Sequence, residues 1–265
     1  MGLARFARAP FAATLRMAAR VNLALRPREY RYVFILSPRR SGSSLLAHIL
    51  TSHPDFVGAG ETHTTYKTAA DLPKLVPRTC QLLRKLQLDA TFIVDKITMD
   101  QYLISDDVLS SSLIHKCVIL IRAPEGSLKS LMNRYGFQEN TALGAYVSRL
   151  ETLARYGGLL RERALLVEYD HLVDHTDATL AALTRFFAVD PPFTANYTTH
   201  KATGKMGDPS ANIFSGRVIR TPGHDYRISA AVMTEGHQAF SKCRERLLIS
   251  GVLPASAERE GSSSG

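Results

Sequence analysis

The chain has 265 residues, of which 45% are hydrophobic, and 33 lysines and arginines against 24 acids give it a net charge of +9. This composition can bury one sizeable core, and the charge favours an anionic ligand, a nucleic acid or an anionic membrane surface. Three cysteines without metal-type spacing indicate neither a disulfide framework nor a zinc site. No apolar run is long enough to span a bilayer, and neither an RNA-binding aromatic motif nor zinc-finger spacing occurs.

The first 28 residues carry six arginines and no acid. On a helical wheel, four of these arginines lie opposite four apolar side chains, so the segment is basic and amphipathic. Pro10 and Pro27 limit its predicted helix to residues 11–26. A packed helix or a flexible leader is preferred, while peripheral membrane contact through residues 1–28 and an organelle transit peptide stay open. We therefore expect an extension over 1–29, a catalytic domain over 30–253 and a flexible tail over 254–265.

Residues 31–36 are an apolar, β-branched and aromatic run typical of a buried strand, and a Leu-rich helical pattern follows the loop 37–44. Such a loop presents backbone N–H groups and the positive end of a helix to a phosphate, and Gly42 allows close approach. The nucleotide-binding pattern G-x-x-x-x-G-K-[ST] is absent, because no Lys follows Gly42. The cation Arg40 instead precedes the Ser-Gly pair. An ordinary Ser-capped turn is the alternative.

Further strands are predicted over 56–60, 90–94, 116–121 and 164–169. Helices are predicted over 62–88 with breaks at Pro73 and Pro77, and over 100–113, 123–134, 140–163, 170–187 and 228–248. Alternating strands and helices predict an α/β domain of P-loop-like type, with a central parallel sheet flanked by helices. The segment 190–225 is too long for a simple connection, and its basic, Gly-rich composition suggests a lid over an anion.

Candidate site residues follow the predicted strands. Glu61 comes after the second strand, where parallel-sheet enzymes place their chemistry, although a solvated acid is the simpler alternative. Asp95-Lys96 ends the third strand, and Arg122 follows the fourth. On the next helix Ser130 and Arg134 share a face, so that an Arg, a Ser and a second Arg can clamp one phosphate.

These residues together resemble the sulfotransferase family that uses 3′-phosphoadenosine 5′-phosphosulfate (PAPS), most closely its tyrosylprotein, Golgi-type and bacterial members. Residues 38–46 are similar to the family's 5′-phosphosulfate loop, and Arg122 with Ser130 to its 3′-phosphate clamp. Gly60-Glu61-Thr62 resembles the segment that carries the catalytic base, Asp95-Lys96 the lysine near the transferring group, and residues 168–172 the segment near the adenine. The resemblance covers about residues 31–190. Arg40 stands where the cytosolic enzymes have Lys.

The resemblance implies transfer of a sulfuryl group from PAPS to an acceptor hydroxyl without a metal. Glu61 is then the general base, and Arg40 and Lys96 stabilise developing charge. The implied cofactor-binding residues are Arg39, Arg40, Ser41, Gly42, Ser43, Ser44, Arg122, Ser130, Arg134 and Tyr169, with Lys205 as a candidate from the C-terminal loop. Arg40 rather than Arg39 is expected to face the sulfate, because it directly precedes the Ser-Gly pair.

We expect a carbohydrate, lipid-linked or small-metabolite acceptor, no nucleic-acid partner and a cytoplasmic location, with membrane-peripheral placement left open. Two alternatives remain at this stage. One is an ATP-dependent small-molecule kinase of P-loop type, which lacks its Walker lysine here. The other is a non-enzymatic basic module that binds RNA or a membrane.

Overall fold

The structure is a computed structural model that describes residues 29–205, 208, 210–220 and 225–256, together with seven residues between 13 and 21 that are helical. The rest of the predicted extension, most of the predicted helix 11–26 and residues 257–265 of the predicted tail lie outside the described residues. Within the described part of the chain, no helix is both long and apolar enough to cross a membrane.

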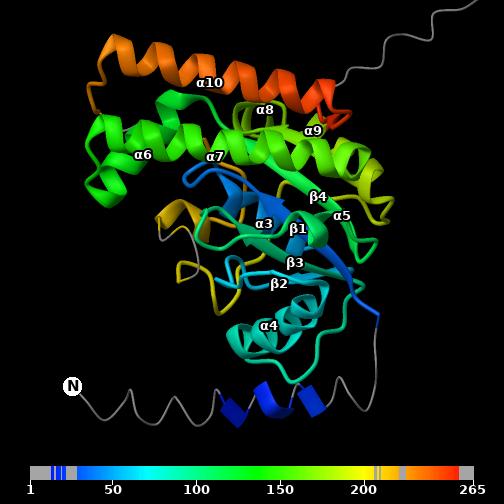
Figure 1. The fold of residues 1–265 in the computed structure, drawn as a ribbon. Helices are drawn as coiled ribbons and strands as arrows, with labels where there is room; N and C mark the ends of the chain where they lie inside the picture. Colours follow the sequence, from blue (N-terminus) through cyan, green and yellow to red (C-terminus); the bar gives the residue numbers. More distant parts are fainter. Residues whose placement is uncertain are drawn as a thin grey trace, which may run out of the picture.

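A six-stranded parallel sheet forms the centre of the molecule (Figure 1). Its order is β2-β3-β1-β4-β5-β6, so the chain runs from β1 to one edge and then crosses to the other side of β1. This reversal creates a crevice at the carboxyl ends of the central strands, where open α/β sheets bind ligands. The predicted α/β class is confirmed. The strands are β1 (Arg31–Leu36), β2 (Phe56–Gly58), β3 (Phe92–Ile97), β4 (Ile114–Ile121), β5 (Ala164–Glu168) and β6 (Leu253–Pro254).

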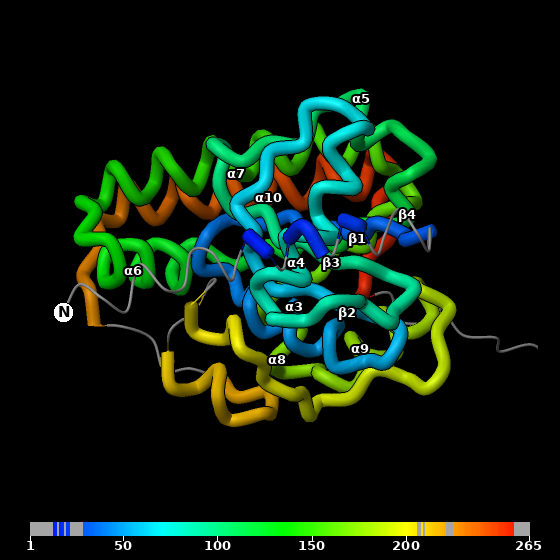
Figure 2. The backbone as a smooth tube through the Cα atoms, turned by 90° about the horizontal axis from the view of Figure 1, so that it is seen from below, coloured from blue at the N-terminus to red at the C-terminus, as the bar shows by residue number. Residues whose placement is uncertain are grey.

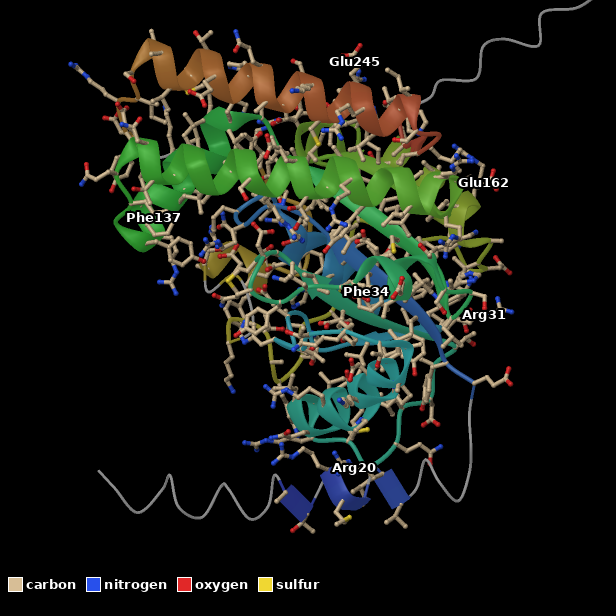
Figure 3. The ribbon with its side chains drawn as sticks, viewed as in Figure 1. Arg20, Arg31, Phe34, Phe137, Glu162 and Glu245 are labelled. Carbon is tan, nitrogen blue, oxygen red and sulfur yellow. The ribbon has the colours of Figure 1, made fainter. Side chains whose placement is uncertain are left out.

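Helices cover both faces of the sheet, because alternate side chains of each buried strand point to opposite faces. In β1, Phe34 packs into the core beneath α4, α5, α6, α7 and α10, whereas Ile35 packs into the core shared with α3, α8 and α9. Figure 2 shows α5, α6, α7 and α10 on one side of the strands and α3, α8 and α9 on the other. Figure 3 places Phe34 in the interior and Glu162 and Glu245 on the outside, and both acids are exposed.

The helices begin and end near local signals in the sequence. Pro124 occupies the first turn of α6, and Gly136 ends that helix with a φ of 66°. Ser105 caps α5 by accepting a hydrogen bond from the N–H of Val108. The helices are α3 (Ser43–Thr51), α4 (Leu75–Leu83), α5 (Asp106–Ser110), α6 (Pro124–Tyr135), α7 (Glu139–Leu160), α8 (Tyr169–Asp174), α9 (Thr176–Phe187) and α10 (Ala230–Ile249), with 3₁₀ turns η1 (Ala69–Lys74), η2 (Arg161–Arg163) and η3 (Ala211–Phe214).

Two predicted elements were placed wrongly around β3. The strand covers Phe92–Ile97 rather than 90–94, so Asp95 and Lys96 lie inside it. The predicted helix 100–113 is reduced to α5. Its first part is extended instead, because Ile104 forms a parallel bridge with Tyr66 and the backbone N–H of Ser105 donates to the Tyr66 carbonyl at 2.9 Å.

The prediction of a helix over 62–88 was also wrong in detail, because the helical turns cover only η1 and α4. Pro73 lies inside η1 and Pro77 in the first turn of α4, where a missing N–H costs no helical hydrogen bond. At the other end of the chain, β6 was not predicted. It carries the packed chain beyond residue 253, since Ala255 is buried and its N–H donates to the Leu166 carbonyl at 2.9 Å.

Asp95 is a buried carboxylate that fastens the loop after β2 to β3. It accepts hydrogen bonds from the backbone N–H of Thr62 at 3.0 Å, from the Thr62 hydroxyl at 2.8 Å and from the Tyr66 hydroxyl at 2.7 Å. Burial raises the pKa of Asp95 to about 6, because these bonds offset the loss of hydration only in part. Asp95 thereby fixes the backbone that carries Glu61.

We predict that the raised pKa of Asp95 makes the fold less stable as pH rises from about 4 to 6. The folded state binds this proton more tightly than the unfolded chain, so the stabilisation is complete below the unfolded pKa, near 4, and is lost through the folded pKa. The free energy of unfolding in urea should fall by up to about 3 kcal/mol across this window. Asp95→Asn, which cannot titrate, should show a smaller fall, and the exposed control Asp107→Asn should keep the parental slope. Equal slopes for Asp95→Asn and the parent would contradict this role.

Candidate functional site

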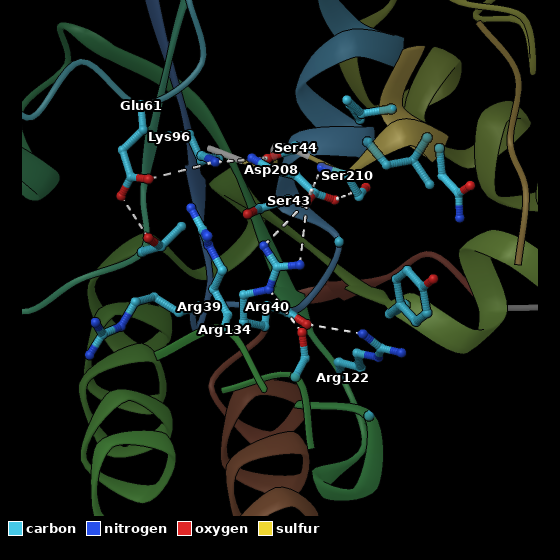
Figure 4. A pocket seen from close by; sticks show the side chains of 18 of the residues that line it. Arg39, Arg40, Ser43, Ser44, Glu61, Lys96, Arg122, Arg134, Asp208 and Ser210 are labelled. Atoms are coloured by element: carbon cyan, nitrogen blue, oxygen red, sulfur yellow. Dashed lines mark hydrogen bonds and ion pairs between the residues drawn. The ribbon is translucent and has the colours of Figure 1, made fainter. Parts of the chain in front are cut away.

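A cavity of about 330 Å³ opens at the carboxyl ends of β1, β3 and β4, in the crevice that the strand order creates (Figure 4). Side chains from both helix layers and from the long loop after α9 line it. Eleven of the residues predicted from the sequence meet there, and these are Arg39, Arg40, Gly42, Ser43, Ser44, Glu61, Lys96, Arg122, Ser130, Arg134 and Tyr169.

Two predicted residues do not line this cavity. Ser41 is fully buried, and its hydroxyl donates to the carbonyl of Pro38 at 2.7 Å, so it closes the turn. Lys205 is exposed on the loop after α9. Its selection from the sequence rested on charge alone, and exposed basic residues are common in loops.

The loop between β1 and α3 has the conformation of an anion-binding turn. Arg40 and Gly42 both adopt the left-handed region, with φ of 65° and 89°. Gly42 is the N-cap of α3, so the positive end of that helix faces the cavity. Ser43 and Ser44, the first residues of α3, are buried against the cavity and add their hydroxyls to the site.

Arg40 joins this loop to α6 and to the long loop after α9. Its Nε donates to Ser130 Oγ at 2.9 Å, while Nη1 and Nη2 lie 3.4 and 3.3 Å from Asp208 Oδ1. The guanidinium therefore spans the cavity, as Figure 4 shows. The hydroxyl of Ser130, which was predicted to bind a phosphate, accepts a hydrogen bond from Arg40 in the structure.

Asp208 was not predicted as a site residue. Besides Arg40, it contacts Ser44, whose Oγ accepts its N–H at 3.1 Å, and Ser210, whose N–H and hydroxyl donate to its carboxylate at 3.1 and 3.0 Å. Burial raises the pKa of Asp208, but the Arg40 charge and the Ser210 bonds outweigh it, so the net pKa lies below the ordinary value. The ionised carboxylate of Asp208 thus pairs with Arg40, which is the cation of the anion-binding turn.

Lys96 and Glu61 form a buried pair beside this turn. Lys96 Nζ donates to Ser44 Oγ at 3.0 Å and lies 3.7 Å from Glu61 Oε2, while Thr98 Oγ1 donates to Glu61 Oε1 at 2.6 Å. Burial lowers the pKa of Lys96, and the Glu61 carboxylate opposes this effect. The pair places a cation beside α3 and an oriented carboxylate within the same cavity.

Arg122 lies in a slot between an aromatic ring and a glycine. Its guanidinium carbon is 4.1 Å from the centre of the Tyr169 ring, and its Nη1 donates to the carbonyl of Arg40 at 3.1 Å. A Cβ on Gly126 would lie 2.4 Å from Arg122 Nε, and one on Gly42 would lie 2.3 Å from the Tyr169 ring. The two glycines therefore allow the ring and the guanidinium to stack, which a cation and an aromatic face favour.

Arg39 and Arg134 lie at the rim. The guanidinium of Arg39 packs over the rings of Tyr135 and Phe137, at 5.2 and 5.6 Å from their centres. It therefore faces the end of α6, whereas the Arg40 side chain contacts Ser130 and Asp208 inside the cavity. Arg134 is exposed and lines the cavity from α6.

The loop after α9, for which a lid over an anion was predicted, lines one side of the cavity. None of its cavity-lining residues was predicted as a site residue, and the fold brings them in from more than 20 residues beyond the last recognised motif. These residues are Tyr197, Asp208, Ser210, Asn212, Ile213, Arg217 and Ile219. Among the residues that the structure describes, no group of three or more His, Cys, Asp or Glu side chains is arranged to hold a metal ion.

Gly42→Ala should destabilise the fold more than a matched change at Gly136. Both positions have positive φ, which costs a residue with a Cβ about 1–2 kcal/mol. At Gly136 the added Cβ meets nothing within 4 Å, whereas at Gly42 it collides with the Tyr169 ring, which adds an overpacking cost of about 1–3 kcal/mol. Urea unfolding of the two variants measures the difference. Equal losses of stability would show that Tyr169 does not pack against Gly42.

Comparisons with known proteins do not show the family of this chain. No family model and no curated protein matches the chain. Among solved structures, the chain matches the crystal structure of mouse sulfotransferase SULT7A1 complexed with PAP, with 12% identity over 85% of this chain and 88% of that chain. The TM-score is 0.44, and a likeness at this level carries no conclusion about fold or function.

Proposed function

We propose that the chain is a sulfotransferase that moves the sulfuryl group of PAPS to an acceptor hydroxyl. The observation that carries this proposal is the charge of the cavity, which six cationic side chains and only two carboxylates line at the carboxyl ends of parallel strands. The anion-binding turn and the Arg122 slot lie in that same cavity. Together they suit a ligand with two separate anionic groups.

The residues present fit such a donor. The turn at Gly42 and the N-terminus of α3 would bind the 5′-phosphosulfate, while Arg122 and Ser130 would bind the 3′-phosphate. Tyr169 would contact the adenosine, because its ring already stacks on Arg122. Asp208 would leave Arg40 when the donor binds, since both are anions that use the same guanidinium.

The transfer requires little covalent chemistry from the protein. The acceptor oxygen forms a bond to sulfur, the bond between sulfur and the bridging oxygen of the 5′-phosphate breaks, and its electron pair stays on the product 3′-phosphoadenosine 5′-phosphate (PAP). Glu61 takes the hydroxyl proton as general base. Arg40 and Lys96 stabilise the charge that develops on the leaving oxygen. The Thr98 hydrogen bond holds Glu61 in place for this step.

A kinase fits the same site less well. In P-loop kinases a lysine inside the loop binds the β- and γ-phosphates, but here the position after Gly42 is Ser43. Lys96 comes from β3 and is paired with Glu61. A basic module without catalysis would not need a buried lysine and glutamate, which are costly to desolvate.

The acceptor class and the location belong to this proposal as well. A carbohydrate, lipid-linked or small-metabolite hydroxyl is the proposed acceptor, and the cytoplasm, with membrane contact through residues 1–28 as an option, is the proposed location. Incubating the purified protein with ³⁵S-labelled PAPS and fractionated cell extracts would identify labelled acceptors directly.

Arg122→Ala and Ser130→Ala should each weaken PAP binding more than tenfold. Each change removes a hydrogen bond to a charged group, worth about 1.5–3 kcal/mol. Isothermal titration calorimetry measures the loss. Arg155→Ala is the matched control, because Arg155 is an exposed arginine paired with Asp106 on α5. If the Arg122→Ala protein bound PAP with parental affinity, Arg122 would not be part of a 3′-phosphate clamp.

Glu61→Gln should leave PAP affinity within a few-fold of the parent and reduce turnover about 100-fold or more. The amide keeps the shape of the side chain but cannot act as a base, and general-base catalysis typically contributes about 10²–10⁴-fold. Turnover is measured with ³⁵S-labelled PAPS, and the exposed Glu151→Gln on α7 is the control. Unchanged turnover would exclude Glu61 as the base. Joint loss of PAP binding and thermal stability would make it a scaffold residue.

A further inference from the structure

A second cavity of about 240 Å³ lies beside the first, between the end of β3 and helices α6 and α7. We propose that it is the acceptor subsite and that it takes a neutral polyhydroxyl compound of about the size of one sugar residue. This inference rests on the proposed function. Its lining includes Arg39, Thr98, Asp100, Gln101, Ser148 and Arg149.

Two side chains lie at the boundary between the cavities, where an acceptor would pass from one to the other. Thr98 and Arg39 line both. Thr98 is buried, and its hydroxyl donates to Glu61 at 2.6 Å, so an occupant of the second cavity lies next to the residue that holds the proposed base. Arg39 is kept at the boundary by its stacking on Tyr135 and Phe137.

A buried arginine makes the floor of the second cavity rigid. Arg149 donates from Nε to the Ser37 carbonyl at 3.1 Å and from Nη2 to the Ile97 carbonyl at 2.7 Å, which ties together the ends of β1 and β3. Its Nη1 donates to Asp100 Oδ1 at 2.9 Å. The arginine side chain is only 2% exposed, but that of Asp100 is 42% exposed. Arg149 therefore orients a carboxylate that lines the second cavity.

The lining chemistry selects the class of ligand. The paired Asp100 and Arg149 cancel in charge, and the hydroxyl of Ser148 lies 3.4 Å from Asp100 Oδ2. With the amide of Gln101, these groups both donate and accept hydrogen bonds, as adjacent hydroxyls require. Asp100 is paired with Arg149, and the remaining cation, Arg39, is stacked on Tyr135 and Phe137, so hydrogen-bonding groups rather than an unpaired charge dominate the lining. A volume below the range of about 300–1,000 Å³ that is typical of drug-sized ligands fits a single sugar ring.

Ligand-detected saturation-transfer NMR on the PAP-saturated protein tests this subsite. The probes are the methyl α-pyranosides of glucose, galactose and mannose, with 4-nitrophenol and methyl glucuronide as the aromatic and anionic alternatives. Gln101→Ala removes an exposed hydrogen-bonding side chain, and Ala145→Leu fills the cavity from α7. Their controls are Gln87→Ala, an exposed glutamine outside the cavity lining, and Gly144→Leu, where an added Cβ meets nothing within 4 Å.

We expect at least one methyl glycoside to give saturation transfer that falls at least threefold in Gln101→Ala and Ala145→Leu but not in the two controls. PAP affinity, measured by calorimetry, should stay within twofold in all four variants. Equal transfer in the cavity variants and the parent, a response only to 4-nitrophenol or methyl glucuronide, or no response to any probe would overturn the assignment. Failure of the parent protein to bind PAP would instead overturn the proposed function. The two outcomes are distinguishable, because calorimetry measures PAP binding and NMR measures binding to the subsite.

Discussion

The candidate site depends on several cationic side chains that lie close together and are partly buried. Arg40, Lys96 and Arg122 meet where β1, β3 and β4 end, and burial, with a smaller effect from the Arg40 charge, lowers the pKa of Lys96 and Arg122. Two unit charges about 4 Å apart interact by about 4 kcal/mol at an effective dielectric constant of 20, which is comparable to the desolvation penalty of one ion. The cluster is therefore stable only because anionic partners stand within it: Glu61 beside Lys96 and Asp208 beside Arg40.

The two carboxylates differ in what an incoming anion would do to them. Glu61 is held from two sides, by Lys96 and by the hydroxyl of Thr98, and it belongs to the sheet side of the cavity. Asp208 comes from the long loop after α9 and contacts the donors of the anion-binding turn, Arg40 and Ser44. An anionic ligand would compete with Asp208 for Arg40 and with Glu61 for Lys96, but Glu61 would keep its hydrogen bond from Thr98. We therefore expect ligand binding to displace the loop that carries Asp208 and to leave the proposed base held by Thr98.

Sequence reasoning located the parts of the site that follow strands, because a parallel sheet brings the ends of its strands to one edge. Arg40, Lys96 and Arg122 were found in this way, whereas Tyr169 was implied only by the family resemblance. Asp208 was missed because its role depends on Arg40, 168 residues away, and the basic loop around it favoured Lys205 instead. Arg149 was missed because a single arginine in a helix is usually solvated, and only the fold reveals that it binds the ends of β1 and β3. The helix expected over 100–113 failed for a similar reason, since its pairing with Tyr66 is not local.

The most direct measurement of the central claim is a calorimetric comparison of PAP, AMP and Mg-ATP binding to the parent protein at one ionic strength. PAP and AMP differ only in the 3′-phosphate, so their ratio isolates the Arg122 slot, and Mg-ATP represents the kinase alternative. A site built for PAPS predicts that PAP binds with one-to-one stoichiometry, at least tenfold tighter than AMP and tighter than Mg-ATP. Equal affinities for PAP and AMP, or a preference for Mg-ATP, would contradict a sulfotransferase donor site.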